Sequence, residues 1–530
     1  MRKGHGEAER LVVEDADLRR FDEAVASGDL GEELTRTVLA NNFLGPKRFG
    51  KMFPDLEPFR PPDDALRSLG RAMREAAPGD PTLNLSSIPA GFTYLGQFID
   101  HDITFDQTVG FPEIDDPEEI EQARTPTLDL DSLYGLGPRR QPELYDQGVR
   151  PSRAPFKIGL TSSTPSSGGI GLPDVPVSLP NDLPRTGKDA VIGDPRNDEN
   201  LVVAQTHLAF LKFHNRLIER EPLGDDGDDD GSATFTQAEE DRRQTPFHRA
   251  RRRVRWHYQW LVLNDFLPNI IDPGVLADIR NDGRKFYDFD GEPFGGRPFM
   301  PLEFSGAAYR FGHSMVRETY NYNRVFNALG PPALTDATLG LLFSFTGGGG
   351  NAPIPSNWII DWRRFFGVGR RELRNFARRI DTKLIPQLHQ LPGTAPGQPS
   401  SLAVRNLLRG SRVGLPTGQA VADAMGFTAL TPTEVAGGED GPILREHGFH
   451  RRTPLWYYVL KEAEVQGEGK RLGEVGSRIV GEVFVGLLEG DRNSFLSKQP
   501  DWKPGLPSGD PDDFKMADLL RFVDEINPIG

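Results

Sequence analysis

The chain has 530 residues, a formal net charge of -15 and no cysteine. This length allows either about three domains or one large domain. The negative charge argues against a nucleic-acid-binding protein whose whole surface is basic. The lack of cysteine excludes disulfides and every metal or cluster site that depends on cysteine ligands.

The first residues, MRKGHGEAER, are charged and contain no apolar segment, so no secretory signal peptide is predicted. The sequence has no run of about 18 apolar residues, so no membrane-spanning helix is expected. The default expectation is a cytoplasmic protein, with leaderless secretion as the alternative.

Apolar residues recur at helical spacing in several stretches of the chain. They predict helices from Pro89 to Phe105 and over 199–220, 237–266, 306–325, 368–392, 400–409, 472–489 and 513–525. Residues 107–185 are rich in Pro, Gly and Ser and predict irregular connections. The sequence therefore predicts a mainly α-helical fold with long loops and few short strands.

The segment GQFIDHD carries a cluster of polar residues within a predicted helix. Gln97, Asp100 and His101 are spaced i, i+3 and i+4, so they share one helix face. Asp102 is rotated by about 100° from His101 and points elsewhere. Both a buried polar site and an ordinary solvated face fit this spacing.

Arg196 and Glu199 lie one turn apart at the start of the next long helix. An ordinary charge pair in the first turn would also explain them. His207 and His214 lie seven residues apart on the apolar stripe of that helix, and the simplest interpretation places both in the core.

Two further residues carry little information by themselves. His313, in YRFGH, follows Gly312, which allows close approach of a flat ligand, but a lone histidine on an apolar helix is usually structural. Asn406, in NLLRGSRVGLP, is equally ordinary when taken alone.

The order of the motifs is far more specific than any one of them. GQFIDHD, TPTLDLDSLYG, GDPRNDE, YRFGH and NLLRGSRVGLP follow one another along the chain. Together they resemble the animal haem peroxidase superfamily, of the myeloperoxidase and lactoperoxidase type, in its bacterial branch. The resemblance covers roughly residues 40–490 and implies a haem between helices. It also implies an N-terminal extension over 1–40 and a catalytic domain over 41–530.

The resemblance implies three catalytic residues on the distal side of the haem: Gln97, His101 and Arg196. On the proximal side it implies His313 as the iron ligand, with Asn406 accepting a hydrogen bond from its imidazole.

Further residues are expected around the implied cofactor, which is haem b. Arg310 and Arg409 match arginines that lie near the haem in this family. Asp100 and Glu199 match the carboxylates that form ester bonds to haem methyl groups, so the haem is expected to be ester-linked.

A calcium site is implied as well, with five ligands: Asp102, Thr125, Thr127, Asp129 and Asp131. Alternate residues of an extended loop point to one side, and hard oxygen ligands suit Ca²⁺. Position 131 is often Ser in the animal enzymes, so Asp131 adds a negative charge that favours tighter binding. Taken alone, TPTLDLD also fits a simple polar loop.

The implied activity is the reduction of hydrogen peroxide with oxidation of a small reductant, namely a halide, thiocyanate or an aromatic donor. A role in the response to oxidative stress follows from it. Asn200 stands where the strongly chloride-oxidising member has Met, so efficient chloride oxidation is not expected.

Two alternative functions stay open. The first is a fatty-acid dioxygenase of the same superfamily. Arg310 disfavours it, because cyclooxygenase-type members have a radical-forming Tyr three residues before the proximal histidine, and Tyr309 is one position off. The second is a non-enzymatic, calcium-binding helical interaction protein with a degenerate site, which the intact motif residues disfavour.

Three other motifs have simpler explanations. The acidic run at 225–231 fits an EF-hand loop only in part, because Gln237 stands where a bidentate Glu is needed. The basic run RARRRVR at 249–255 is interpreted as a solvated helix stripe rather than a nucleic-acid site. TGGGGN at 346–351 lacks the GK[ST] of a phosphate-binding loop and predicts a flexible turn.

Overall fold

The computed structural model describes residues 49–76, 84–106, 116, 120, 122–148, 153–163, 177–221, 245–291, 294–328, 335–368, 374–391, 394, 397–509 and 512–529. The predicted N-terminal extension and the acidic run at 225–231, with Gln237, lie outside the described residues.

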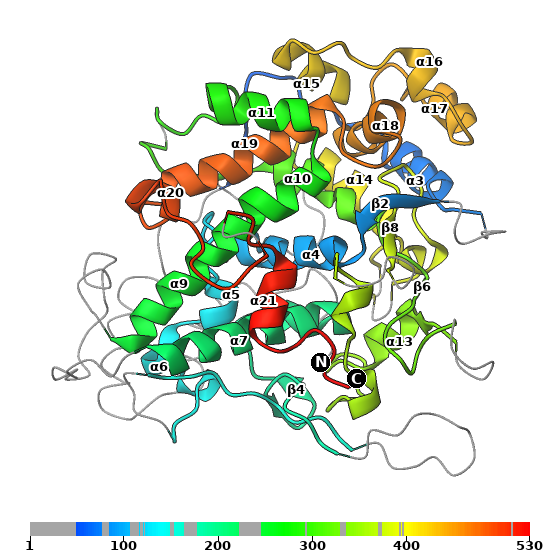
Figure 1. Cartoon of the computed structure of the whole chain (residues 1–530). Coiled ribbons are helices and arrows are strands. Elements are labelled where there is room, and N and C mark those ends of the chain that lie inside the picture. The colour runs from blue at the N-terminus through cyan, green and yellow to red at the C-terminus, as the bar shows by residue number, and fades with distance from the viewer. Residues whose placement is uncertain are drawn as a thin grey trace.

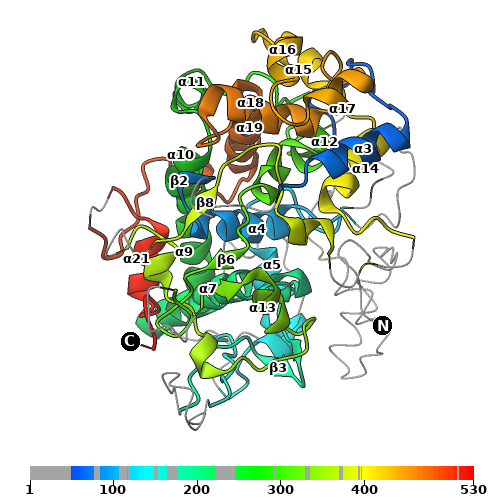
Figure 2. The same cartoon turned by 90° about the vertical axis from the view of Figure 1, so that its right-hand side faces the viewer.

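Helix α4 (Gly91–Ile103) crosses the centre of the molecule, and longer helices lie on both sides of it (Figure 1 and Figure 2). On one side, α7 (Leu201–Arg220) contacts α4 and is covered by α9 (Pro246–Leu261). On the other side, α18 (Leu455–Gly467) packs against α19 (Glu474–Gly490). One large cluster of buried apolar side chains runs through these helices, so α4 is held in the interior.

Local signals explain where the two helices beneath α4 begin. The side chains of Asn200 and Thr245 accept backbone N–H groups at the starts of α7 and α9, and Pro246 is the first residue of α9. α9 continues into a π-helical segment (Val262–Phe266) and then into α10 (Leu267–Ile270). These three consecutive segments pack against the interior helices, with α9 contacting α7 and the π-helical segment contacting α4.

The other helices are shorter. They are α3 (Asp63–Ala72), α5 (Asp131–Tyr134), α6 (Gly137–Arg140), α11 (Pro273–Asp282), α12 (Leu302–Ser305), α13 (Leu339–Ser344), α14 (Leu402–Arg412), α15 (Gly418–Met425), α16 (Pro432–Val435), α17 (Gly441–Glu446), α20 (Phe495–Lys498) and α21 (Met516–Phe522). Short 3₁₀ segments are η2 (Pro142–Leu144), η3 (Pro195–Asp198), η5 (Ala308–His313), η6 (Ser356–Trp358), η7 (Trp362–Arg364) and η9 (Pro386–His389).

The strands of the described residues are short and pair two by two. One pair is parallel: β1 (Phe49–Gly50) with β5 (Met300–Pro301). The antiparallel pairs are β2 (Leu85–Pro89) with β8 (Phe376–Arg378), β3 (Arg185–Thr186) with β4 (Asp189–Ala190), and β6 (Thr319–Tyr320) with β7 (Ala337–Thr338). The predicted mainly α-helical fold with few short strands is thus confirmed. No described helix is both long and apolar enough to cross a membrane.

Most of the predicted helices are present within the described residues, as α4, α7, α9 with its π-helical continuation, α14, α19 and α21. The helix predicted over 306–325 is wrong, since that stretch holds only η5 and β6. Gly306 and Gly312 lower the helix propensity there.

The helix predicted over 368–392 is also wrong for its described part. Residues 376–378 pair with β2 instead, and η9 begins at Pro386. Tertiary pairing and proline therefore override the helical spacing.

Candidate functional site

The polar face of α4 meets η3 and the start of α7 in the interior. η3 begins at Pro195 and is capped by Asp194, whose carboxylate accepts the backbone N–H of Arg196 at 2.9 Å. The sequence GDPRNDE therefore forms one tight turn against α4. This turn brings the predicted residues of the two motifs together.

His101 is 3% exposed, and its Nδ1 lies 2.9 Å from Oδ1 of Asn197. Burial, and next the charge of Arg196, lowers the pKa of His101. The imidazole is therefore neutral near neutral pH. Because the amide oxygen of Asn197 can only accept, Nδ1 donates to it, and Nε2 carries the free lone pair.

Gln97 connects the same helix to the residues after the turn. Its Nε2 donates to Glu199 at 3.3 Å, and its Oε1 accepts from Asn200 at 3.0 Å. Asn200 also caps α7, so the amide of Gln97 is tied to a helix terminus. The structure therefore brings Gln97, His101 and Glu199 to one region, as the sequence predicts.

Arg196 is held in place from several directions. It donates to the backbone oxygens of His101 and Thr104, each at 2.8 Å, and to Oδ2 of Asp194 at 2.7 Å. Its guanidinium also lies 4.1 Å above the ring of Phe105. The side chain is 18% exposed, so this cation is fixed beside His101 without being fully enclosed.

Asp194 is completely buried between two arginines, Arg196 and Arg124. Burial alone would raise the pKa of Asp194, but the two guanidinium groups hold it well below its usual range. Asp194 therefore stays ionised and keeps both arginines in position.

His313, the predicted iron ligand, is the last residue of η5, and η5 contacts α4. Nδ2 of Asn406 lies 2.8 Å from Nδ1 of His313, and Oδ1 of Asn406 accepts from Arg310 at 2.7 Å. The pairing of Asn406 with His313 is as predicted, but the amide nitrogen faces the ring where the oxygen was expected. The reason is Arg310, which has only donors and so takes the amide oxygen.

Asp100 and Arg409 lie near this second element. Asp100 is half-buried, accepts the hydroxyl of Thr104 at 2.8 Å, and lies within electrostatic reach of Arg310. Arg409, on α14, forms an ion pair with Asp106 just beyond α4. The predicted haem residues thus come from α4, η3, η5 and α14.

The interior next to these residues is suited to a flat cofactor. Gln97, Asp100 and His313 are half-buried, although α4 lies in the centre of the molecule. A Cβ atom added to Gly312, the residue before His313, would meet no heavy atom of the described residues within 4 Å, so there is open space at this position of η5. An imidazole on each of two elements, His101 on α4 and His313 on η5, and the nearby arginines match what a haem and its carboxylates require.

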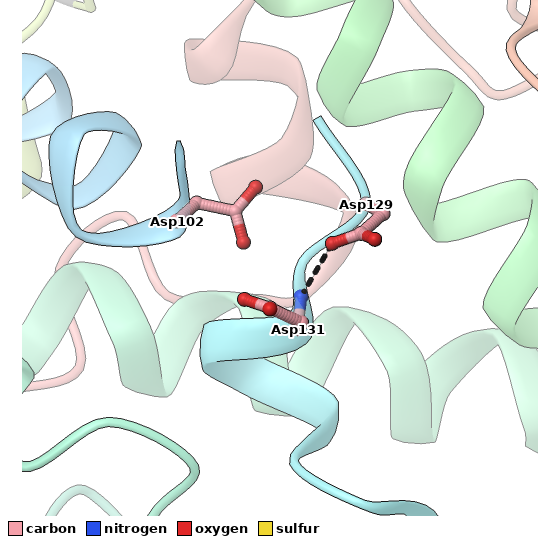
Figure 3. Close-up of side chains that lie close together, drawn as sticks. All are labelled: Asp102, Asp129 and Asp131. Atoms are coloured by element: carbon pink, nitrogen blue, oxygen red, sulfur yellow. Dashed lines mark hydrogen bonds between the residues drawn. The ribbon is translucent and has the colours of Figure 1, made fainter. Parts of the chain in front are cut away.

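A second buried cluster lies at the end of α4 (Figure 3). One carboxylate oxygen each of Asp102, Asp129 and Asp131 lies within 4.8 Å of the others, and all three side chains are buried. Burial, and then repulsion from Asp129 and Asp131, raises the pKa of Asp102 well above its ordinary value. A divalent cation would remove this repulsion, and an all-oxygen set suits Ca²⁺.

The predicted threonines belong to the same loop. The hydroxyls of Thr125 and Thr127 donate to Oδ2 of Asp129 at 2.9 and 3.0 Å, while its Oδ1 accepts the backbone N–H of Asp131. Asp102 accepts from Ser132 and from the backbone of Leu130. The structure therefore assembles all five predicted calcium residues.

Sequence reasoning missed Arg124, Asn197 and the pairing role of Asp194. Arg124 is buried and donates to Asp131 at 3.1 Å and to Asp194, so it joins the acidic cluster to the Arg196 site. Its position directly before TPTLDLD was the available signal, but nothing local in the sequence shows that such an arginine is buried.

Two sequence interpretations can be compared with the structure directly. His207 and His214 are fully buried core residues, as the simplest interpretation had it. The basic run 249–255 on α9 is only partly a solvated stripe, because Arg251 and Arg255 are buried. The guanidinium of Arg251 lies 5.1 Å from the centroid of the Tyr134 ring, and Arg255 lies within electrostatic reach of Asp491.

Comparison with known sequences indicates the same family as the ordered motifs do. The family model described as "Animal haem peroxidase" matches residues 106–501. "Peroxidase-like protein" of Margaritifera margaritifera is 24% identical over 351 residues, which cover 62% of this chain and 40% of the relative. "Heme peroxidase 2" of Caenorhabditis elegans is 22% identical over 316 residues, covering 57% and 39%. The chain thus spans less than half the length of these relatives.

Solved structures share the fold. Peroxidase A from Dictyostelium discoideum has a TM-score of 0.54 and 17% identity, with 93% of each chain covered. Fatty acid alpha-dioxygenase of Oryza sativa has a TM-score of 0.52 and 14% identity, with 96% and 91% covered. Both kinds of oxidoreductase have this fold, so the fold alone does not separate the two activities.

Proposed function

Since the chain belongs to the animal haem peroxidase family, we propose that it is a haem-dependent peroxidase that reduces hydrogen peroxide and oxidises a small reductant. The observation that carries this proposal is the placement of His101: a buried imidazole with Nδ1 bonded to Asn197, with no hydrogen bond to Nε2 among the described residues, and with the guanidinium of Arg196 fastened to its backbone oxygen. A fixed base of this kind beside a fixed cation is what peroxide cleavage requires.

In this proposal, a bound haem would supply the redox-active iron needed for reduction of the peroxide and oxidation of the reductant. His101 would take a proton from one oxygen of hydrogen peroxide and return it to the other, so that this second oxygen departs as water. Arg196 stabilises the negative charge that develops on the departing oxygen.

His313, on η5, would hold the haem iron through Nε2. This bond requires the proton of His313 to be on Nδ1, so Oδ1 of Asn406 would have to accept from it. Arg310 already donates to that oxygen at 2.7 Å. An amide oxygen has two lone pairs, so it could serve both donors, but only after the amide turns far enough to bring Oδ1 to the present place of Nδ2 and Arg310 follows the oxygen.

Two contacts favour peroxidase over fatty-acid dioxygenase chemistry. Arg310, three residues before His313, is fastened to Asn406 and to the backbone of Ser305, so no phenol occupies that position. The hydroxyl of Tyr309 donates to the backbone oxygen of Gly96 at 3.1 Å, and its ring stacks on Phe304. Tyr309 is therefore packed as a structural residue.

The acidic cluster supports a second element of the proposal, a resident Ca²⁺ bound by Asp102, Asp129 and Asp131 with Thr125 and Thr127. Three buried carboxylates so close together are costly without a cation. The ion would fix the end of the helix that carries His101.

The test is to purify the chain with haem and to measure two activities side by side. Peroxide consumption with an aromatic donor should be fast, and oxygen uptake with a polyunsaturated fatty acid in the absence of peroxide should be negligible. His101→Gln should keep the haem and slow peroxide reduction by at least about 100-fold. His313→Ala should instead lose stable haem binding.

Other outcomes select the alternatives. Oxygen uptake with fatty acid without peroxide would identify a dioxygenase. Purified protein that takes up no haem would favour a calcium-binding interaction protein.

A further inference from the structure

The buried side chains of His101, Asn197 and His207 are joined in a line by two hydrogen bonds. Nδ1 of His101 lies 2.9 Å from Oδ1 of Asn197, and Nδ2 of Asn197 lies 3.0 Å from Nδ1 of His207. Their exposed fractions are 3%, 0% and 0%. The line joins α4, η3 and α7, so residues from three elements have to be placed correctly to form it.

We infer that Asn197, held by His207, is a positioning residue that fixes the tautomer of His101. This inference rests on the proposed function, because it concerns which nitrogen of His101 is free to act as a base. Asn197 itself touches neither peroxide nor haem in this inference; it acts only through the ring of His101.

The direction of each hydrogen bond follows from the chemistry of the amide. Its oxygen can only accept, so His101 must carry its proton on Nδ1 and leave Nε2 unprotonated. Its nitrogen can only donate, so Nδ1 of His207 must accept and the proton of that ring is on Nε2. The amide therefore couples the two rings: turning it over would reverse both tautomers.

His207 is suited to the role of a permanent acceptor. Its Nε2 has no hydrogen-bond partner among the described residues, and its ring packs edge to face on Phe98 with the centroids 6.0 Å apart. Burial lowers the pKa of His207 to about 3, so the ring stays neutral at physiological pH. A neutral ring keeps one acceptor nitrogen, and the only amide group placed against it is that of Asn197 within the described part of the chain.

This arrangement explains a buried polar chain that packing alone would disfavour. Each unpaired polar atom in the interior costs free energy, and Nε2 of His207 has no hydrogen-bond partner among the described residues. A role in keeping Nε2 of His101 unprotonated accounts for these three buried polar side chains.

The tautomer can be read directly by nuclear magnetic resonance. The full-length chain, labelled with ¹⁵N-histidine and expressed without added haem, gives ring correlations that separate protonated from unprotonated nitrogens. Loss of a signal set in His101→Gln and in His207→Gln assigns the two rings. At one fixed neutral pH, His101 should carry its proton on Nδ1 and His207 on Nε2.

Variants then separate positioning from folding. Asn197→Leu should make His101 a mixture of tautomers and slow the reaction of the haem-loaded protein with peroxide by about tenfold or more. His207→Phe should act in the same way, whereas His207→Gln offers an acceptor oxygen and should restore both readouts. Gln205→Leu is the matched control, because Gln205 is a buried amide of α7 that donates to Asn181 at 3.0 Å, away from His101.

Two results would overturn the inference. One is a proton on Nε2 of His101 in the unaltered chain, which means that the amide has the opposite orientation. The other is an unchanged His101 tautomer in Asn197→Leu. Failure of the proposed peroxidase function is distinguishable, since it would remove the peroxide reaction and leave the ring signals of His101 and His207 as expected.

Discussion

His101 and Asp102 are consecutive residues of α4, yet their side chains enter two different buried sites. His101 reaches Asn197, whereas Asp102 accepts from Ser132 at 3.1 Å within the acidic cluster. The rotation of about 100° between neighbouring helix residues separates them. Any shift of the end of α4 at the acidic cluster therefore moves the proposed base as well.

Removal of calcium should destabilise the fold. Without a cation, the buried carboxylates of Asp102, Asp129 and Asp131 repel one another. A chelator should lower the melting temperature, and added Ca²⁺ should restore it. In Asp129→Asn the effect of the chelator should largely disappear, while Asp423→Asn, at an exposed position of α15, should respond like the unaltered chain. Identical melting with and without the chelator would argue against a resident ion.

Arg124→Met should be strongly destabilising. Arg124 is buried and bonds both Asp131 and Asp194, so its loss leaves two buried carboxylates without that partner. Such a loss costs about 3–5 kcal/mol of unfolding free energy. Arg216→Met is the control, because Arg216 forms an exposed pair with Glu219 that is worth about 0–1 kcal/mol. Similar melting temperatures for the two variants would contradict the bridging role.

The buried histidines predict a loss of stability in acid. Burial lowers the pKa of His214 to about 3, against about 6.5 in an unfolded chain. Between these values the unfolded state binds the extra proton, so stability falls as the pH falls below about 6.5. At pH 5 the cost is about 2 kcal/mol for this one residue.

The measurement is the melting temperature at pH 8 and pH 5 with calcium in excess. The difference between the two should be smaller in His214→Gln than in the unaltered chain. Tyr134→Phe removes the hydroxyl 3.0 Å from Nδ1 of His214 but leaves the ring buried, so it should keep the full pH dependence. An equal acid effect in His214→Gln would show that other groups cause it.

Local sequence was sufficient for the parts of the site that lie on one helix. The spacing of Gln97, Asp100 and His101 correctly predicted a shared face of α4, and the rotation of Asp102 correctly placed it elsewhere. Ordered motifs were needed to join α4 to η3, η5 and α14, because spacing within a helix says nothing about contacts between distant segments.

The residues that prediction missed act through long-range contacts. Asn197 matters because His207, ten residues later, lies behind it, and Arg124 matters because Asp194 is 70 residues away in the chain. The strand at 376–378 was missed for the same reason, since its partner β2 lies at 85–89. Such pairings are set by packing, which no local pattern encodes.

Ester links to the haem are the remaining prediction. The carboxylate of Asp100 accepts the hydroxyl of Thr104 at 2.8 Å, and that of Glu199 accepts from Gln97 at 3.3 Å. Both are thus bonded to neutral groups, while the guanidinium of Arg196 bonds Asp194 and backbone oxygens.

A carboxylate enclosed against a porphyrin is costly to keep charged, and an ester to a haem methyl removes that charge. After exposure to peroxide, acidified organic solvent should therefore leave the haem on the protein. Asp100→Ala and Glu199→Gln should each retain one link, and the double variant should release all of its haem. Mass spectrometry of the released haem and of haem-bearing peptides reads this out, with Asp423→Ala as the control that keeps both links. Unmodified haem released completely from peroxide-treated protein would refute the esters, and it would leave the roles of His101 and His313 untouched, because those roles depend on ring nitrogens and not on the carboxylates.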